Sequence, residues 1–568
     1  MKFERTIFSQ VRSRIVRSQI GLVVLFSFSM LLVLVETAAA AGVTSYKVVQ
    51  INPPGATSTY ANTLNKSSAV VGNFTNSSKV VEGFKYAGGK YTIIKFPKSN
   101  NFTRANGIND SNLVAGDFFG TDNFYHGFTL SSGKYTQYDV NKGVVSTSIF
   151  AVNNNGDLAG AAGFSGPNQG FVDIGGTVTE FYGSGTDSTF ALAINNSDQA
   201  VGQYFDSGNL SHGFSRDSSG VITEVAVPGA LQTACFGIND AGVITGWYED
   251  SSSQFHGFTD TAGVFVTLDF IQANGINNSG AFVGYYYGPG TAGITQYGYL
   301  ATPHTLKSLA TVAVTKAQST STLAVNNSDV MVGQYTNSKG VTHGLMLSGA
   351  KATNIDDPKA IAGTTVCYGI NSSKQIVGYY TTSSNTAQGF LYAGGTYTDI
   401  GPVGATNSYA ENINDSGVIA GAYVDSGGVE HAFTYNGSTY TTIDAPGASS
   451  TLGWGINASG EITLDWTDSF GITEASLYNG TAFTSINVPG ALSSNAHAIN
   501  KSGNVVFSWS DLYGNLHGAI LSGGSFYVFD DPSGTGTRAD GLNDSGLMVG
   551  RFLQSGSTTN FDGFKGSL

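Results

Sequence analysis

Five positions in the second half of the sequence carry side chains that could bind a sugar or another polar ligand. They occupy the same place in successive copies of a repeat, three residues before a recurrent asparagine. Carboxylate and imidazole groups form hydrogen bonds and transfer protons, and aromatic rings offer flat apolar faces. If they converge, they would form a ligand site. The candidate ligand-binding residues are Tyr368, Glu411, Trp454, His497 and Asp540.

The same residues have a plainer interpretation, in which they pack between neighbouring sheets. The ligand-site hypothesis fails if Glu411, His497 and Asp540 are remote from one another or lie in separate layers. The sequence has no sialidase-type S-x-D-x-G-x-x-W box and no G-x-S-x-G motif, so no catalytic residue is assigned. In the other seven copies the position holds Asn62, Asn106, Phe150, Leu192, Phe236, Asn274 and Leu323.

Six histidines recur at another position of the repeat and could suggest a metal site. Equivalent positions on different repeats are too widely spaced to ligate one zinc ion, whose ligands lie about 2 Å from the metal. Other copies carry Glu or Gln there, so we expect a structural hydrogen bond to the main chain or to a turn. These histidines are His126, His212, His256, His343, His431 and His517.

Turns such as Asn414-Asp415-Ser416-Gly417 raise the alternative of calcium binding. A calcium loop needs several carboxylates or carbonyls that converge, and each turn offers at most one carboxylate. The residue after the asparagine also varies, with lysine or alanine in some copies. Ordinary turn chemistry explains the motif, and no metal or cofactor is predicted.

The elements that position all these residues are twelve repeats of about 43 residues. Each copy contains a Gly-Ile-Asn-like core, a tight turn, a Val-Gly-aromatic segment, a third segment and a fourth segment before a Pro-Gly-Ala-like corner. Four short strands with turns at this period are typical of a β-propeller blade. The recurrent asparagines are Asn65, Asn109, Asn153, Asn195, Asn239, Asn277, Asn326, Asn371, Asn414, Asn457, Asn500 and Asn543.

Several positions within the repeat indicate how a blade packs. The residue before the asparagine is aliphatic in every copy, which marks a core position. Three residues after it stands Gly, Asn or Asp in all copies except two, which carry Ser68 and Lys374, and these types suit a left-handed turn residue. Seven residues after it stands Gly, except for Leu464 and Phe507, so we expect the tenth and eleventh blades to pack differently.

The two cysteines, Cys235 and Cys367, share the position four residues before the asparagine, where other copies carry mostly Ala. This position is a small, buried slot. Because equivalent positions three repeats apart are distant in space, we expect two buried free thiols and no disulfide.

Both ends of the repeat region are incomplete in a complementary way. The first repeat is preceded by an isolated strand around Tyr46, and the last lacks its fourth strand. Twelve blades exceed the usual four to eight in a ring, and the spacing is irregular between the fifth and seventh repeats. We therefore predict two tandem six-bladed propellers, residues 41–305 and 306–568, in which the strand near Tyr46 closes blade six and Lys307–Val314 closes the last blade. The alternative is one ring of twelve repeats or an open array.

The copies resemble the HAF-repeat family of bacterial extracellular proteins. The resemblance lies in the Ile-Asn-Asp-Ser-Gly turn, the Val-Gly-aromatic strand, the His-Gly-Phe or His-Ala-Phe triplet, as at His431-Ala432-Phe433, and the Pro-Gly-Ala corner. It spans essentially the whole sequence after residue 40 and implies secretion, but it brings no catalytic residues.

Residues 1–40 read as a signal peptide. Basic residues precede an apolar run from Ile20 to Val35, and Ala38-Ala39-Ala40 forms a cleavage motif. We expect the protein to be secreted, or alternatively periplasmic or held by its N-terminal segment. The net charge of −13 argues against nucleic-acid or anionic-membrane partners, which need cationic surfaces.

These observations predict a secreted, monomeric binding or interaction scaffold for an extracellular polysaccharide, matrix or protein. A carbohydrate-active hydrolase or lyase with its site on the second ring is one alternative, and a purely structural surface protein is another. The turn residues would be the same under each hypothesis.

Overall fold

The computed structural model describes residues 34–36, 43–140, 146–163, 166–183, 188–268, 272–290, 293–306, 308–469, 471, 473–511, 513–531 and 534–568. Their regular elements are the strands β1 to β49, and four-stranded sheets recur along the sequence. The predicted fold class, an all-β chain of propeller blades, is confirmed. Within these ranges no helix is long and apolar enough to cross a membrane. The predicted signal peptide lies outside the described residues except for β1 (Leu34–Glu36), which pairs with β26 (Ser308–Val314).

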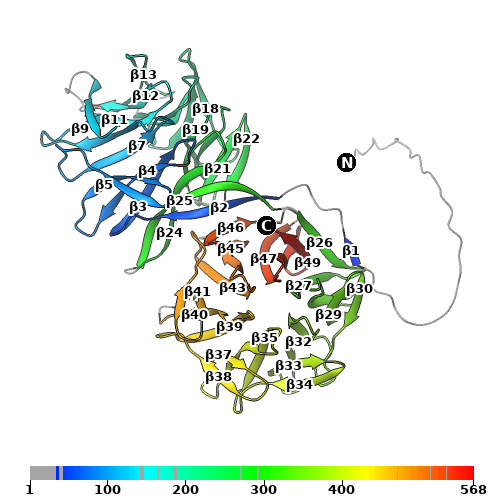
Figure 1. Ribbon diagram of the computed structural model, residues 1–568. Helices are drawn as coiled ribbons and strands as arrows, with labels where there is room; N and C mark the ends of the chain where they lie inside the picture. The colour runs from blue at the N-terminus through cyan, green and yellow to red at the C-terminus, as the bar shows by residue number, and fades with distance from the viewer. Residues whose placement is uncertain are drawn as a thin grey trace, which may run out of the picture.

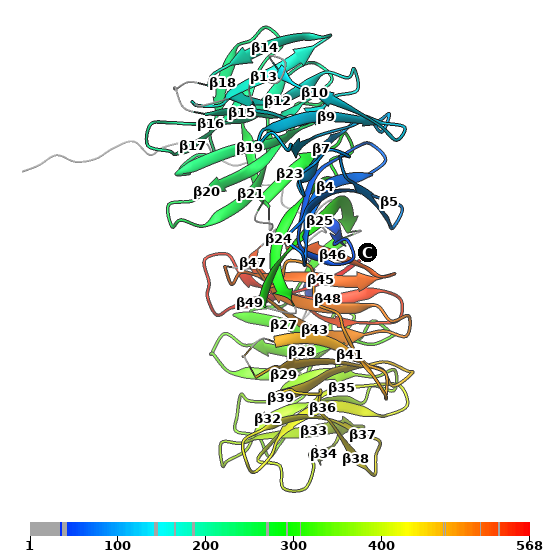
Figure 2. The same ribbon diagram turned by 90° about the vertical axis from the view of Figure 1, so that its left-hand side faces the viewer.

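The strands form two rings of six blades, which Figures 1 and 2 show from two directions. In the first ring the chain runs from the innermost to the outermost strand of each blade, except that the outermost strand of blade six, β2, comes from the segment before blade one. The blades are β3 (Ala56–Leu64), β4 (Val70–Asn76), β5 (Val81–Ala87), β6 (Lys90–Ile94); β7 (Thr103–Ile108), β8 (Val114–Phe119), β9 (Tyr125–Ser131), β10 (Lys134–Tyr138); β11 (Ser146–Val152), β12 (Leu158–Gly163), β13 (Gln169–Ile174), β14 (Thr177–Phe181); β15 (Thr189–Ile194), β16 (Ala200–Phe205), β17 (Ser211–Arg216), β18 (Ile222–Val225); β19 (Gln232–Ile238), β20 (Ile244–Glu249), β21 (Phe255–Thr261), β22 (Val264–Leu268); and β23 (Gln272–Ile276), β24 (Phe282–Gly290), β25 (Gly293–Leu306), β2 (Val43–Ile51).

The second ring repeats this plan, and Figure 1 shows it nearly along its axis. Its blades are β27 (Ser319–Val325), β28 (Met331–Thr336), β29 (Thr342–Ser348), β30 (Lys351–Asn354); β31 (Val366–Ile370), β32 (Ile376–Thr381), β33 (Ala387–Ala393), β34 (Thr396–Ile400); β35 (Asn407–Ile413), β36 (Ile419–Val424), β37 (Glu430–Tyr435), β38 (Tyr440–Ile443); β39 (Ser450–Ile456), β40 (Ile462–Thr467), β41 (Thr473–Tyr478), β42 (Phe483–Ser485); β43 (Ser493–Ile499), β44 (Val505–Ser510), β45 (Leu516–Ser522), β46 (Ser525–Phe529); and β47 (Gly534–Leu542), β48 (Leu547–Gln554), β49 (Phe561–Ser567), β26.

Each ring is closed by a strand from the chain segment that precedes it. β2 pairs antiparallel with β25 and becomes the outermost strand of blade six. β26 pairs antiparallel with β49 and becomes the outermost strand of blade twelve. Pairing of the otherwise incomplete sheet with a distant strand covers an edge that would otherwise template aggregation.

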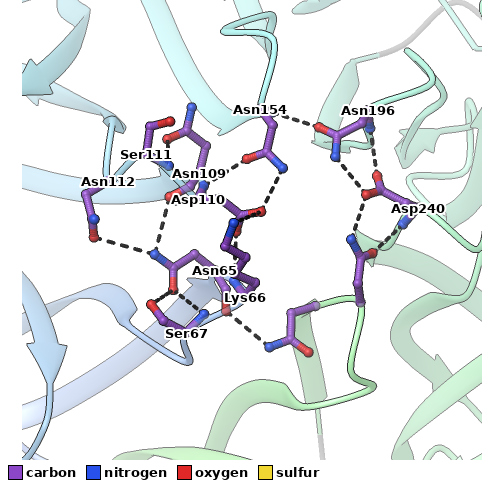
Figure 3. A network of polar contacts seen from close by, with 12 residues as sticks. Asn65, Lys66, Ser67, Asn109, Asp110, Ser111, Asn112, Asn154, Asn196 and Asp240 are labelled. Atoms are coloured by element: carbon purple, nitrogen blue, oxygen red, sulfur yellow. Dashed lines mark hydrogen bonds and ion pairs between the residues drawn. The ribbon is translucent and has the colours of Figure 1, made fainter.

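The recurrent asparagine links each blade to the next. Its Oδ1 accepts the main-chain N–H groups two and four residues later, as Asn65 does from Ser67 and Ala69, and this fixes the turn. Its Nδ2 donates to the main-chain oxygen of the equivalent asparagine in the next blade, 3.3 Å away for Asn65 and Asn109. Figure 3 shows part of this network.

These amide bonds form two circles of six, which correspond to the two rings. The first circle returns from Asn277 to Asn65, and the second returns from Asn543 to Asn326. The remaining bonds join Asn109 to Asn153, Asn153 to Asn195, Asn195 to Asn239, Asn239 to Asn277, Asn326 to Asn371, Asn371 to Asn414, Asn414 to Asn457, Asn457 to Asn500 and Asn500 to Asn543.

The residue after each asparagine adds a parallel set of interblade bonds in the first ring. The main-chain N–H of Lys66 donates to Asp110 Oδ1 at 2.8 Å, and that of Asp110 donates to Asn154 Oδ1 at 2.8 Å. The pattern continues through Asn196 to Asp240, as Figure 3 shows, and then to Asn278. The Asp and Asn residues of this turn therefore join blades as well as shape the turn, a role that the sequence did not indicate.

The left-handed backbone conformation at the turn occurs in every copy, including the two whose residue types do not favour it. All twelve residues three positions after the asparagine have positive φ, including Ser68 at 57° and Lys374 at 59°. The turn geometry is therefore retained where the sequence departs from Gly, Asn and Asp.

The glycine seven residues after the asparagine makes room for an aromatic ring. In blade five, a Cβ at Gly246 would lie 2.8 Å from Cε1 of Phe258, its neighbour on β21. Blades ten and eleven exchange the sizes of the two residues: Leu464 lies opposite Ser476, and Phe507 lies opposite Ala519. The prediction that these two blades pack differently is confirmed, and the physical reason is conservation of volume across the strand pair.

The repeated histidines pair with carboxylates on their own blades. Nδ1 of His126, His343 and His431 lies 2.8 Å from an oxygen of the aspartate thirteen residues later. The Nε2 atoms of His126 and His256 lie near the turn residues Asp122 and Asp250. A structural hydrogen bond was predicted, and these contacts have that character, but the partners are carboxylate side chains.

The two cysteines are buried and free, as predicted. Burial raises the pKa of both thiols. A Cβ at Gly213 would lie 2.9 Å from Sγ of Cys235, so the thiol fills the narrow space beside the neighbouring blade.

Candidate functional site

In every blade, the residue three positions before the asparagine lies at an irregularity of the innermost strand. The register of β35 with β36, for example, shifts between Ala410 and Asn412, which leaves Glu411 outside the regular pairing. The same shift isolates Asn62 in β3 and His497 in β43. A bulge of this kind redirects a side chain, and here it does so on the strands nearest the two axes.

In the first ring, all six of these residues line one cavity of about 480 Å³, the axial cavity. Asn62, Asn106 and Asn274 come from blades one, two and six, which are successive because the ring closes between blades six and one. Phe150, Leu192 and Phe236 come from the other three blades. The axial cavity therefore has an amide half and an apolar half.

The amide half is held by hydrogen bonds between blades. Asn62 Nδ2 donates to Asn73 Oδ1, to Ala105 O and to Asn106 Oδ1 at 3.1 to 3.2 Å. Asn274 Nδ2 donates to Ala61 O at 2.9 Å, and Asn274 Oδ1 accepts from Gln272 Nε2 at 2.7 Å. The described residues give Asn62 Oδ1 and Gln272 Oε1 no donor, so both oxygens are free to accept from a ligand hydroxyl.

Arg104 is a cationic residue at this cavity, and its charge is balanced within the protein. Its Nε donates to Asp117 Oδ1 at 2.9 Å, and its Nη2 donates to the other oxygen of the same carboxylate. Burial opposes the charge of the guanidinium, but Asp117 outweighs that effect and raises the pKa of Arg104. Because Asp117 is fully buried and also accepts from Asn106 and Ser148, this end of the cavity is close to neutral.

Two tyrosines stand beside the amides at the same cavity. Tyr60 and Tyr285 pack edge to face with ring centroids 5.3 Å apart, and Tyr60 is 37% exposed. Accessible aromatic faces close to amide acceptors are features of sites that bind polar ring compounds.

The central channel of each ring is narrow at the end formed by its circle of asparagines. The cavity lined by the circle of the first ring is about 90 Å³, and that lined by the circle of the second ring is about 70 Å³. In the first ring, the channel is therefore wide at the bulge residues and narrow at the asparagines.

The five predicted residues occupy the bulge positions of the second ring on β31, β35, β39, β43 and β47. Trp454 and His497 are in contact, with ring centroids 5.2 Å apart in an edge-to-face arrangement. Tyr368 is close enough to Glu411 and Asp540 for both carboxylates to raise its pKa, after the larger effect of burial. Beside the larger effect of burial, Arg538 and Arg551 lower the pKa of both His497 and Asp540, which links these side chains in one polar cluster.

Burial dominates the electrostatics of this cluster. It raises the pKa of Glu411 to about 8 and that of Asp465 to about 7. It also lowers the pKa of His497 well below its ordinary value, and the two arginines lower it further. At neutral pH, His497 is therefore uncharged, and Glu411 retains its proton.

Internal contacts already occupy part of the second-ring cluster. Arg551 Nε lies 3.4 Å from Asp540 Oδ2, and His497 Nε2 lies 2.7 Å from Ser508 Oγ. Glu411 Oε2 is buried without a hydrogen-bond partner among the described residues. In the part of the chain that the structure describes, no group of three or more His, Cys, Asp or Glu side chains is placed to hold a metal ion.

Sequence reasoning missed the axial cavity of the first ring. Asn62, Asn106 and Asn274 were visible at the bulge position, but their neighbourhood depends on contact between the first and sixth blades. Arg104 and Gln272 lie outside the repeat core and carried no recurring signal, and Tyr285 carried only the general signal of the Val-Gly-aromatic segment. Aligned asparagines at one repeat position were the only available indication.

No protein-family model and no curated protein matches this chain. Among solved structures, it is similar to the SapL1 lectin in complex with α-methyl fucoside, with a TM-score of 0.32 and 14% identity over 44% of this chain and 94% of that one. It is also similar to a gluconolactonase from Xanthomonas campestris, with a TM-score of 0.31 and 10% identity over 46% and 91% of the two chains. A third similar structure is the β-propeller domain of the trilobed protease from Pyrococcus furiosus, with a TM-score of 0.29 and 10% identity over 50% and 89%.

Proposed function

We propose that this protein is an extracellular carbohydrate-binding scaffold of the HAF-repeat type, which holds a neutral saccharide in the axial cavity of its first ring. The observation that carries the proposal is the division of that cavity into an amide half and an apolar half. A pyranose presents hydroxyls at its edge and C–H groups on its faces, so it could contact both halves at once.

Three features favour a neutral saccharide over an ionic ligand. The charge of Arg104 is balanced by Asp117, the groups left to accept hydrogen bonds are amide oxygens, and the opposite half is apolar. A charged ligand would lose hydration in this cavity without gaining an opposite charge. Export by the N-terminal segment would place the cavity where extracellular polysaccharides occur.

A glycan array and calorimetry with the protein lacking residues 1–40 would test the proposal. We expect a neutral oligosaccharide to bind, and Phe236→Ala to weaken binding at least tenfold because it removes part of the apolar half. Trp454→Ala is the matched control, because Trp454 has the equivalent bulge position in the second ring. Equal binding by wild type and Phe236→Ala, or loss only with Trp454→Ala, would contradict the assignment to the first ring.

A hydrolase or lyase centred on the second ring is a second candidate. It is favoured by Glu411, whose pKa of about 8 keeps the carboxyl group protonated at neutral pH, as a general acid requires. Cleavage of a glycan that is lost with both Glu411→Gln and Asp540→Asn would support this candidate. Glycan binding that survives both changes would support the scaffold.

A further inference from the structure

The two rings are joined edge to edge by strand pairing. β2, the outermost strand of blade six, also pairs antiparallel with β46, the outermost strand of blade eleven. Tyr46 lies opposite Val528, and Val48 lies opposite Phe526. Figure 2 shows β25 and β46 close together where the rings meet. The pairing holds the two rings in a defined relative position, so the surface at their junction has a defined shape.

A cavity of about 600 Å³, the junction cleft, lies beside this pairing and takes residues from both rings. The first ring contributes Gln50, Tyr286 and Tyr297, whereas the second contributes Glu474, Asn487 and Phe526. Tyr286 and Tyr297 lie with ring centroids 5.6 Å apart. Ligand sites occur preferentially at such domain interfaces.

Glu474 is the residue that sets this cleft apart from equivalent places on other blades. It occupies the position of the repeated histidines, whose partner thirteen residues later is an aspartate in blades two, seven, nine and eleven. Blade one has Glu82 there, and the partner becomes Lys95, with Lys95 Nζ 3.7 Å from Glu82 Oε1. In these blades the two residues thirteen positions apart are therefore either a histidine and an aspartate or a glutamate and a lysine.

Blade ten breaks this relationship. The residue thirteen positions after Glu474 is Asn487, whose Oδ1 accepts the main-chain N–H of Ala475 and whose Nδ2 donates to Ser485 Oγ. The contact that Glu474 receives is a long one, 3.5 Å from Ser485 Oγ to Oε2. Among the described residues, no Lys, Arg or His forms an ion pair with Glu474. The negative charge of its carboxylate at the cleft is therefore not balanced by a cationic side chain.

We propose that the junction cleft binds an amino-sugar oligosaccharide, with its ammonium group at Glu474 and its rings against Tyr297 and Phe526. A carboxylate with aromatic faces attracts a cation by both ion pairing and cation–π interaction. The amides of Gln50 and Asn487 and the hydroxyl of Ser485, at the end of β42, also line the cleft and suit the remaining sugar hydroxyls. The overall negative charge of the chain attracts the same ligand from a distance.

The test uses two probes on the protein lacking residues 1–40: a β-1,4-linked glucosamine tetramer, with its amines protonated, and its N-acetylated form. We expect calorimetry to show at least tenfold tighter binding of the amine form, weakened by added salt. Glu474→Gln should remove this preference. Glu82→Gln is the matched control, because it makes the same change at the same blade position outside the cleft, and it should keep the preference.

Other outcomes overturn the proposal. Equal affinity of wild type for the two tetramers, no binding of either, or an unchanged preference in Glu474→Gln would each reject the site. A lysine-containing peptide that binds more tightly than the amine tetramer would reject a saccharide as the occupant. Phe236→Ala should leave amine binding intact, which separates this site from the axial cavity, and thermal unfolding of each variant identifies loss of fold.

Discussion

Asn277 Nδ2 donates a hydrogen bond to the main-chain oxygen of Asn65, 3.1 Å away and 212 residues earlier in the sequence. This bond completes the first circle of six amides. It also brings the sixth blade against the first, so the amides of the axial cavity come from neighbouring blades.

Replacement of Asn277 by Ala should destabilise the first ring. The change removes the donor to Asn65 and the acceptor for the main-chain N–H groups of Ser279 and Ala281. Since buried groups left without partners cost about 1 to 3 kcal/mol each, we expect a loss of at least that size in the free energy of unfolding. Chemical denaturation measures it, and Asn100→Ala, which changes an exposed side chain of the same ring outside the amide circle, serves as the control. Equal stability of the two variants would show that the circle contributes little.

The exchanged residue sizes in blade eleven predict non-additive effects. Phe507→Gly should leave a cavity and cost about 3 to 5 kcal/mol, and Ala519→Phe should overpack the blade and cost about 1 to 3 kcal/mol. The double variant restores the arrangement of the other blades, so its loss should be well below the sum. A double-mutant cycle from denaturation curves measures the coupling, and strict additivity would refute volume exchange across β44 and β45.

His431 should make stability depend on pH. Burial lowers its pKa, but hydrogen bonds with Asp444 and Asp425 outweigh that effect and raise the pKa above its ordinary value near 6.5. The stabilisation is therefore complete below pH 6.5 and is lost as pH rises through the native pKa. His431→Gln, with the residue that blade eight carries at Gln388, should flatten that part of the profile. Melting temperatures across pH 5 to 9 would measure this difference, and parallel profiles would contradict it.

Ionisation of Glu411 should also lower the stability as pH rises, over a wider pH range than that of His431. Burial raises its pKa to about 8, so the folded state binds a proton more tightly than the unfolded state, whose Glu pKa is about 4.3. Stability is consequently greatest below about pH 4.3 and falls as pH rises towards 8. Glu411→Gln should raise the melting temperature at pH 8 relative to wild type and change it little at pH 4. An equal effect at both values would show that ionisation of Glu411 is not involved.

The local structure of this protein could be predicted from repeat positions. Alignment of the copies indicated the strands, the left-handed turn, the buried aliphatic residue before Asn65 and its equivalents, and the altered packing at Leu464 and Phe507. These features depend on residues within one blade, whose side chains meet because they are close in sequence. Even the unusual turn residues Ser68 and Lys374 adopt the conformation that the other copies indicate.

The candidate sites could be predicted only in part. The sequence singled out the position three residues before the asparagine because its residue types vary while its surroundings do not, and the structure places this position at a bulge of the innermost strand. The carboxylates and aromatic rings of the second ring drew attention there, whereas the uncharged amides of the first ring did not. The sequence showed Glu474 at the position that other copies fill with histidine. Only the structure showed that it lies at the junction cleft without a cationic partner.

The sequence by itself determined the blade: its four strands, its turns and its core. Only the tertiary structure decided that Asn274 lies beside Asn62, that Arg104 reaches the axial cavity, and that β2 joins β46. The reason is that repeated local signals are much the same in every blade: they predicted two rings of six but left open one ring of twelve, in which blades six and one are not neighbours. That choice is made by ring closure and by pairing of strand edges between segments hundreds of residues apart.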